Sequence, residues 1–138
     1  MAEVVDHLRA VPLFQGLSDR ALDSVARLAA ERSFDTGEAV TTEGEAGDAF
    51  YVVTAGHLDV TQGGRHVSDL GPGDFLGEIS LIDGQPRTAT VTAVEPVDVV
   101  CIRRDAFLEL IDSHGAVRHG VLMALTERIR RDAATTRD

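Results

Sequence analysis

The chain has 138 residues, of which 43% are hydrophobic and 26% charged, and its formal net charge is −10. This length and composition suit one globular domain, 1–138, and leave too few residues for two independent cores. The acidic balance disfavours nucleic acid as a partner. The sequence contains no lysine, which excludes Schiff-base chemistry and a phosphate-binding lysine.

The N-terminus, MAEVVDHLRA, lacks the basic stretch and apolar block of a signal peptide. No apolar run approaches the roughly 20 residues that a membrane-spanning helix needs. The single cysteine, Cys101, lies in the alternating stretch VDVVCI, which favours a buried small hydrophobe over a nucleophile. We therefore expect a cytoplasmic protein with no membrane span in this chain.

The first predicted element is an amphipathic helix over about 19–31, within a helical lead that covers 1–32. Ser18 suits the N-cap position of this helix. Apolar residues follow at helical spacing: Leu22, Val25, Ala26, Leu28 and Ala29. We expect the helix to pack as a lid on the part of the chain that follows.

Between residues 33 and 102 the pattern changes to short β-rich segments that glycine or proline separates. These segments are RSFD, EAVTTE, AFYVVTAG, HLDVTQ, RHVSDL, TATVTAV and VDVVCI. Short strands at such close spacing predict an antiparallel, jelly-roll-like β-roll rather than a doubly wound parallel sheet. The expected fold class is therefore mainly β with flanking helices.

Two C-terminal helices, RDAFLELIDSH and GAVRHGVLMALTERIRR, are predicted over 103–131, and a tail of 132–138 follows them. In the second helix an apolar stripe recurs at every fourth position, at Val117, Val121, Leu125 and Ile129. The stripe fits three uses equally well: a lid face, the seam of a homodimer, or packing in the core.

Catalytic motifs are missing from the sequence, so we expect no enzyme and no catalytic residue. GPGDFLG is similar to a dinucleotide fingerprint, but its third glycine comes one position late and no long helix follows. The five histidines are scattered and form no His-x-His pair, so we assign no metal ligand and no cofactor.

The segment GEISLIDGQPRTATV, residues 77–91, places Glu78 nine positions before Arg87. Successive backbone N–H groups at the start of this segment would be unsatisfied inside the barrel unless an anion met them, and arginine suits bidentate recognition of phosphate. A carboxylate only accepts hydrogen bonds, which suits a sugar hydroxyl. With an apolar wall for a flat base, these groups describe a compact nucleotide site. An ordinary ion pair between Glu78 and Arg87 on a surface loop explains the same residues.

A longer stretch, GDFLGEISLIDGQPRTATVTA, strongly resembles the phosphate-binding cassette of the cyclic-nucleotide-binding domain family. That family includes catabolite-activator-type regulators, kinase regulatory subunits and cyclic-nucleotide-gated channels. GEAVTTEGEAGDAFYVVTAGHLDV is similar to the first strands of the family, and PLFQGLSDRAL to its leading helix. The resemblance covers about residues 11–131 and implies a sensor or regulatory domain that binds cyclic AMP or cyclic GMP.

The resemblance implies a role for each residue of the cassette. Glu78 would accept from the ribose 2′-hydroxyl, and Arg87 would pair with the cyclic phosphate. The backbone amides of Ile79 and Ser80 would complete the phosphate cradle, and Gly77 would allow close approach of the backbone.

Two further residues bear on recognition of the base. A hydroxyl directly after the arginine occurs in relatives that prefer cyclic GMP and also in bacterial relatives that bind cyclic AMP. Thr88 therefore leaves the choice open, and it also suits the start of a strand. We expect cyclic AMP, with Val67 packing against the base.

In the family the last helix closes over the filled site. By resemblance, the lid would contain Leu125, Arg128 and Ile129. Arg128 either reaches Glu78 or the base, or is a solvated arginine in the last helical turn. The chain has no room for the family's DNA-binding domain, so we expect no direct DNA binding. The expected partners are an effector protein or a fused output domain. A ligand-independent interaction module is the alternative.

Overall fold

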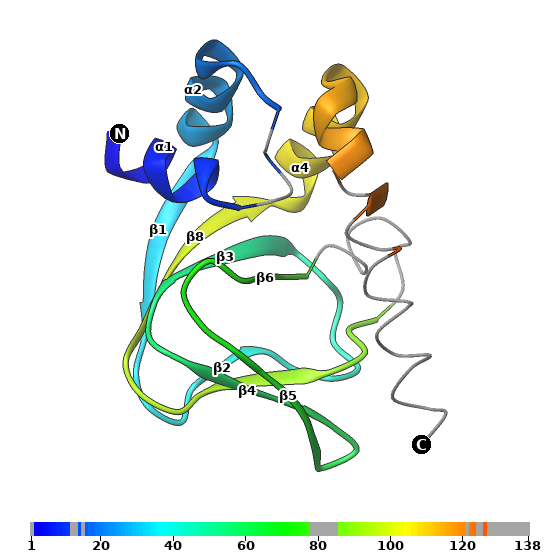
Figure 1. Ribbon diagram of the computed structural model, residues 1–138. Coiled ribbons are helices and arrows are strands. Elements are labelled where there is room, and N and C mark those ends of the chain that lie inside the picture. Colours follow the sequence, from blue (N-terminus) through cyan, green and yellow to red (C-terminus); the bar gives the residue numbers. More distant parts are fainter. Residues whose placement is uncertain are drawn as a thin grey trace.

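The computed structural model describes residues 2–11, 14, 16–77, 86–120, 122–123 and 126 (Figure 1). In this part of the chain two helices come first, then eight strands, then helix α4 and a further helical segment over 115–120. The elements are α1 (Ala2–Arg9), α2 (Asp19–Arg27), β1 (Ala29–Phe34), β2 (Ala39–Thr41), β3 (Ala49–Ala55), β4 (Leu58–Gln62), β5 (Arg65–Leu70), β6 (Phe75–Leu76), β7 (Thr90–Ala93), β8 (Val97–Arg103) and α4 (Arg104–Ser113).

The strands form two four-stranded antiparallel sheets, in the orders β1-β8-β3-β6 and β2-β7-β4-β5. The helices gather on the side of the first sheet that faces away from the second (Figure 1). This arrangement confirms the predicted β-roll with flanking helices. None of the described helices is both long enough and apolar enough to cross a membrane.

Strands β3 and β8 are buried on both faces, which explains why their sequences are apolar runs rather than alternating patterns. In β3, Phe50 and Val52 belong to a core between the first sheet and the helices. Their neighbours Tyr51 and Val53 belong to a second core inside the roll. Cys101 of β8 lies in this inner core with 8% of its surface exposed, which confirms the prediction of a buried small side chain.

Helix α2 begins as predicted, because the Ser18 hydroxyl accepts a hydrogen bond from the backbone N–H of Ala21. The predicted end at residue 31 is wrong: the helix ends at Arg27, and the chain enters β1 at Ala29. The stretch AAER favours a helix by propensity, but an antiparallel ladder with β8 pairs all six residues of β1. Tertiary pairing outweighs the weak local preference here.

Helix α1 lies within the predicted helical lead, 1–32, although only the helix over about 19–31 was singled out there, and strand β6 was not predicted. Strand β6 has only two residues, and its pairing with β3 defines it. Such a strand has no periodicity of its own, so a pattern along the chain cannot reveal it.

Both predicted C-terminal helices have described residues. The first is α4, and residues 115–120 are also helical. Val117, the first residue of the apolar stripe, is fully buried in the core beneath the helices. Of the three uses considered for the stripe, this residue serves core packing. Val121, Leu125 and Ile129, the other three members, lie outside the described residues.

Candidate functional site

Arg87 lies just before β7, and the loop between β2 and β3 holds its backbone. Its N–H donates to the Glu45 carbonyl at 2.7 Å, and its own carbonyl accepts from the N–H of Gly44 at 2.9 Å. These two bonds fix the direction in which the side chain leaves the backbone.

The guanidinium group of Arg87 is buried, with 6% of the side-chain surface exposed. Nη1 donates to the Gly77 carbonyl at 2.9 Å, and Nη2 donates to the Ala49 carbonyl at 2.7 Å. One side chain therefore links the end of β6, the start of β3 and the entry to β7, which belong to different sheets.

This cation has little negative charge nearby among the described residues. Asp48 approaches Nη2 only to 4.0 Å, and 86% of its side chain is exposed, so solvent screens the pair. The two hydrogen-bonded acceptors are neutral carbonyls. Arg87 is also the only buried charged residue in the described part of the chain. A buried charge without a close counter-ion is costly, and an anion placed beside it would remove that cost.

Gly77 follows β6 with a φ of +97°, a conformation that L side chains rarely adopt. A Cβ at this position would lie 2.7 Å from the Ala49 carbonyl oxygen and 2.7 Å from Nη1 of Arg87. Both of these atoms already take part in the hydrogen bonds of the guanidinium and cannot move freely. Glycine is therefore required for the arginine to reach its acceptors.

The wall of the roll behind this site is apolar and uncharged. Tyr51 of β3 pairs with Leu76 of β6 and with Cys101 of β8, and all three side chains are buried. Burial raises the pKa of the Tyr51 phenol and also raises the pKa of the Cys101 thiol. Both groups are therefore neutral at physiological pH.

The structure brings Gly77 and Arg87 together, as the sequence analysis expected. Thr88 is exposed next to the arginine, and Val67 lies on β5 with 52% of its surface exposed. The remaining predicted site residues lie outside the described part of the chain: Glu78, Ile79, Ser80, Leu125, Arg128 and Ile129. The ion pair between Glu78 and Arg87 therefore stays untested.

Sequence reasoning missed the acceptors of the guanidinium and the loop that holds its backbone. Ala49, Gly44 and Glu45 contribute backbone atoms rather than side chains. Contacts made by backbone atoms do not depend on residue type, so the sequence rarely indicates them. The glycine-rich stretch EGEAGD was the one sign that this loop comes close to another segment.

Comparisons with known proteins bear directly on this geometry. The family model described as the cyclic nucleotide-binding domain matches residues 31–114, which include Gly77 and Arg87. The cAMP-dependent protein kinase regulatory subunit of Yarrowia lipolytica is 39% identical over 106 residues, which are 75% of this chain and 28% of that protein. A cyclic nucleotide-gated potassium channel of Rhizobium etli is 34% identical over 119 residues, which are 86% of this chain and 33% of the channel.

Among solved structures, the Thermus thermophilus catabolite activator protein matches with a TM-score of 0.82 and 31% identity, over 91% of this chain and 61% of that one. The chain thus spans less than two thirds of each of these relatives. The family match extends over more than half of the chain and includes the buried arginine and its glycine. The chain belongs to the cyclic nucleotide-binding domain family.

Proposed function

We propose that this domain binds cyclic AMP through Arg87 and serves as a regulatory, non-catalytic sensor. The observation that carries the proposal is the buried guanidinium, whose hydrogen-bonded partners among the described residues are the neutral carbonyls of Gly77 and Ala49. Burial makes an anionic ligand favourable, because charges attract more strongly where water is excluded.

A cyclic phosphate suits this arginine in charge and in geometry. A guanidinium has five N–H donors in a planar fork, and two of them bond to the described carbonyls. The other donors can form the two parallel bonds that arginine makes to phosphate oxygens. The two carbonyls then hold the fork in place before the ligand arrives, which lowers the ordering cost of binding.

We assign the remaining contacts from the cassette sequence. Glu78 accepts from the ribose 2′-hydroxyl, and the amides of Ile79 and Ser80 extend the phosphate cradle next to Gly77. The preference for cyclic AMP is supported by the name of the Yarrowia relative, a cAMP-dependent regulatory subunit. Thr88 contributes its hydroxyl to the phosphate side of the site.

Val67 is proposed to pack against the base. It lies on β5 with 52% of its surface exposed, so a flat aromatic ligand can cover it without moving a buried side chain. Covering an exposed valine is favourable because its apolar surface leaves water.

Occupancy is proposed to reach the output through the chain after residue 120, where Leu125, Arg128 and Ile129 form the lid. The start of this region is held firmly: Val117 is fully buried, and Nη1 of Arg118 donates to the carbonyls of Ile111 and Asp112. If the lid contacts only the filled site while the segment before it stays fixed, binding of the ligand shifts the lid from one position to another. An effector protein, a fused output domain or a homodimer partner would then sense that shift.

Isothermal titration calorimetry with cyclic AMP and cyclic GMP tests the proposal. The protein is first unfolded, dialysed and refolded, and its ultraviolet spectrum is checked for carried-over nucleotide. Arg87→Ala should weaken binding by a factor of at least roughly 10, which corresponds to about 1.4 kcal/mol. Arg103→Ala is the matched control, because Arg103 is an exposed arginine at the end of β8 and should leave affinity unchanged.

The base preference follows from the same titrations. Tighter binding of cyclic AMP supports the proposal as stated, whereas tighter binding of cyclic GMP overturns the assigned ligand and keeps the phosphate site. No heat with either nucleotide, from folded and ligand-free protein, overturns the sensor function and leaves the ligand-independent interaction module.

A further inference from the structure

A second charged cluster lies on the β4–β5 hairpin. Asp59 of β4 and Asp69 of β5 are directly opposite each other in the antiparallel ladder. Like charges in this position repel and destabilise the pairing. His66 lies close to both carboxylates, and among the described residues these three side chains form the one group of three possible metal ligands that converge in space.

A β-bulge brings His66 to this face of the sheet. Val60 pairs with Ser68, but the next residue, Thr61, pairs with His66, so Val67 has no partner across the ladder. Without the extra residue, strict alternation would place His66 and Asp69 on opposite faces. The bulge therefore redirects the imidazole toward the two carboxylates, as bulges do elsewhere in proteins.

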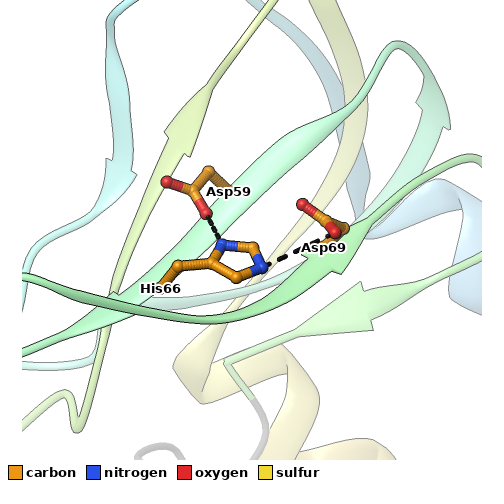
Figure 2. Close-up of side chains that lie close together, drawn as sticks. All are labelled: Asp59, His66 and Asp69. Atoms are coloured by element: carbon orange, nitrogen blue, oxygen red, sulfur yellow. Dashed lines mark hydrogen bonds and ion pairs between the residues drawn. The ribbon is translucent and has the colours of Figure 1, made fainter.

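The imidazole lies between the two carboxylates (Figure 2). Nδ1 of His66 is hydrogen-bonded to Asp59. In the neutral imidazole that donates its Nδ1 proton to Asp59, Nε2 has a lone pair that faces the carboxylate of Asp69, and these two electron-rich groups repel each other. A positive charge between Nε2 and Asp69 would remove this conflict.

The spacing favours a metal ion over a proton as that charge. Nε2 lies 3.7 Å from the carboxylate oxygen of Asp69. That distance exceeds the range of about 2.7–3.2 Å for a hydrogen bond. Two ligands on one zinc ion, each about 2.1 Å from the metal at the tetrahedral angle, are about 3.4 Å apart. A small movement of the exposed Asp69 side chain would therefore bring its oxygen and Nε2 of His66 to the spacing of two zinc ligands.

We propose that Nε2 of His66 and the carboxylate of Asp69 bind one divalent transition-metal ion of the zinc type, with Asp59 as the residue that orients the imidazole. The ligand atoms of all three residues lie within 4.8 Å of one another. A carboxylate that accepts from the other ring nitrogen of a ligating histidine fixes its tautomer and strengthens its donation. Water fills the other coordination positions, since the cluster lies at the surface.

The ligand chemistry and the net charge support this type of ion. Imidazole favours zinc and similar metals, whereas calcium and magnesium prefer all-oxygen sites. A net charge of −10 also attracts cations of any kind, so ion selectivity is an informative readout. A metal binds the neutral imidazole, so a proton competes with the metal and binding should weaken as the pH falls.

The test is a calorimetric titration of tag-free, chelator-treated protein with zinc chloride at pH 7.5, without nucleotide. We expect one ion per chain and much weaker binding of calcium and magnesium. Asp69→Asn should lower the association constant by at least roughly 10-fold, and Asp59→Asn should lower it within the range of about 10–100-fold typical of orienting residues.

His57→Gln is the matched control. Nδ1 of His57 also lies beside a carboxylate, that of Glu95 at 2.5 Å, and both side chains are exposed. Among the described residues, the convergence of three ligating groups is confined to His66 and its two aspartates, so this substitution should leave zinc binding unchanged. Nuclear magnetic resonance of the histidine side chains should show the zinc-induced change at Nε2 of His66.

Three outcomes overturn the proposal. One is the absence of saturable zinc binding to the folded wild-type protein. Another is retention of full affinity in both aspartate variants, and the third is loss of affinity in the His57 variant. Thermal melts in chelator establish whether each variant is folded, and the nuclear magnetic resonance signal of His66 decides the assignment if one aspartate variant fails to fold.

Discussion

The two sheets of the roll differ in how many of their faces are covered. In the β1-β8-β3-β6 sheet, the central strands β3 and β8 have side chains buried on both faces, beneath the helices and inside the roll. In the β2-β7-β4-β5 sheet, strand β5 is exposed over all but its last residue. We call the first the covered sheet and the second, which buries only its inner face, the uncovered sheet. The covered sheet contributes more to stability, whereas the outer face of the uncovered sheet can hold charged side chains.

Arg87 lies where the two sheets meet. It precedes β7 of the uncovered sheet, and its guanidinium bonds to the first residue of β3 and to the residue after β6 in the covered one. The proposed nucleotide site therefore depends on the relative placement of both sheets, whereas the proposed metal site depends on one hairpin.

The largest expected difference between the sheets is in stability. Phe50 of β3 is fully buried, with its ring 4.9 Å from Phe107, 5.8 Å from Phe75 and 6.0 Å from Phe14. Phe50→Ala should lower the free energy of unfolding by about 3–5 kcal/mol, because it removes a large apolar side chain and leaves a cavity. Val67→Ala on β5 should change it by no more than about 0.5 kcal/mol. Urea unfolding measures both changes, and equal losses would contradict the larger contribution of the covered sheet to stability.

A smaller effect is expected at the junction. Gly77 and Gly73 have φ values of +97° and +94°, but a Cβ at Gly73 would have open space around it. Alanine at either position should cost about 1–2 kcal/mol for the left-handed backbone. Gly77→Ala should cost about 1–3 kcal/mol more, because its Cβ would press on Ala49 and Arg87.

Nucleotide titration of the same two variants separates backbone strain from damage to the site. Gly77→Ala should weaken binding strongly, because it displaces the guanidinium, while Gly73→Ala should bind as the wild type does. Matching stabilities and affinities for the two variants would show that the close approach of Gly77 is unimportant.

The smallest of the three effects concerns the inner face of β8. Burial raises the pKa of the Cys101 thiol, so less of the reactive thiolate is present at any given pH in the folded chain. Alkylation by iodoacetamide at pH 8 should therefore be slower in the folded than in the urea-unfolded protein. The folded rate should keep rising at pH values where the unfolded rate has levelled. Equal rates would indicate that the inner face opens readily to solvent.

Much of the fold followed from local patterns. Helix α2 begins after Ser18 because the Ser18 hydroxyl caps the helix. The preference of serine for this position depends only on residues near it in the sequence. The seven predicted strand segments correspond to β1–β5, β7 and β8, because alternation and turn residues mark them. The end of α2 and the two-residue strand β6 depend on pairing with strands that are distant in the chain, β8 and β3. Local propensity cannot predict such pairing.

The candidate site divides in the same way. Arginine is the side chain best suited to phosphate, which singled out Arg87, and the resemblance to the cassette implied the role of Gly77. The sequence could not reveal that the carbonyl of Ala49 would hold the guanidinium, because a backbone acceptor is the same in every residue. The sequence analysis assigned no metal ligand because the five histidines are scattered and form no His-x-His pair, and the register that brings His66 beside Asp59 is visible only in the structure.

Local sequence was enough to predict where most strands and helices form and which positions turn, because these properties depend on side-chain chemistry and on neighbours along the chain. Which sheet faces are covered, what the buried guanidinium bonds to and where His66 points became visible only in the folded chain. Those outcomes depend on ladder register, and the extra residue at Val67 shows how one unpaired position redirects a side chain to the opposite face of a sheet.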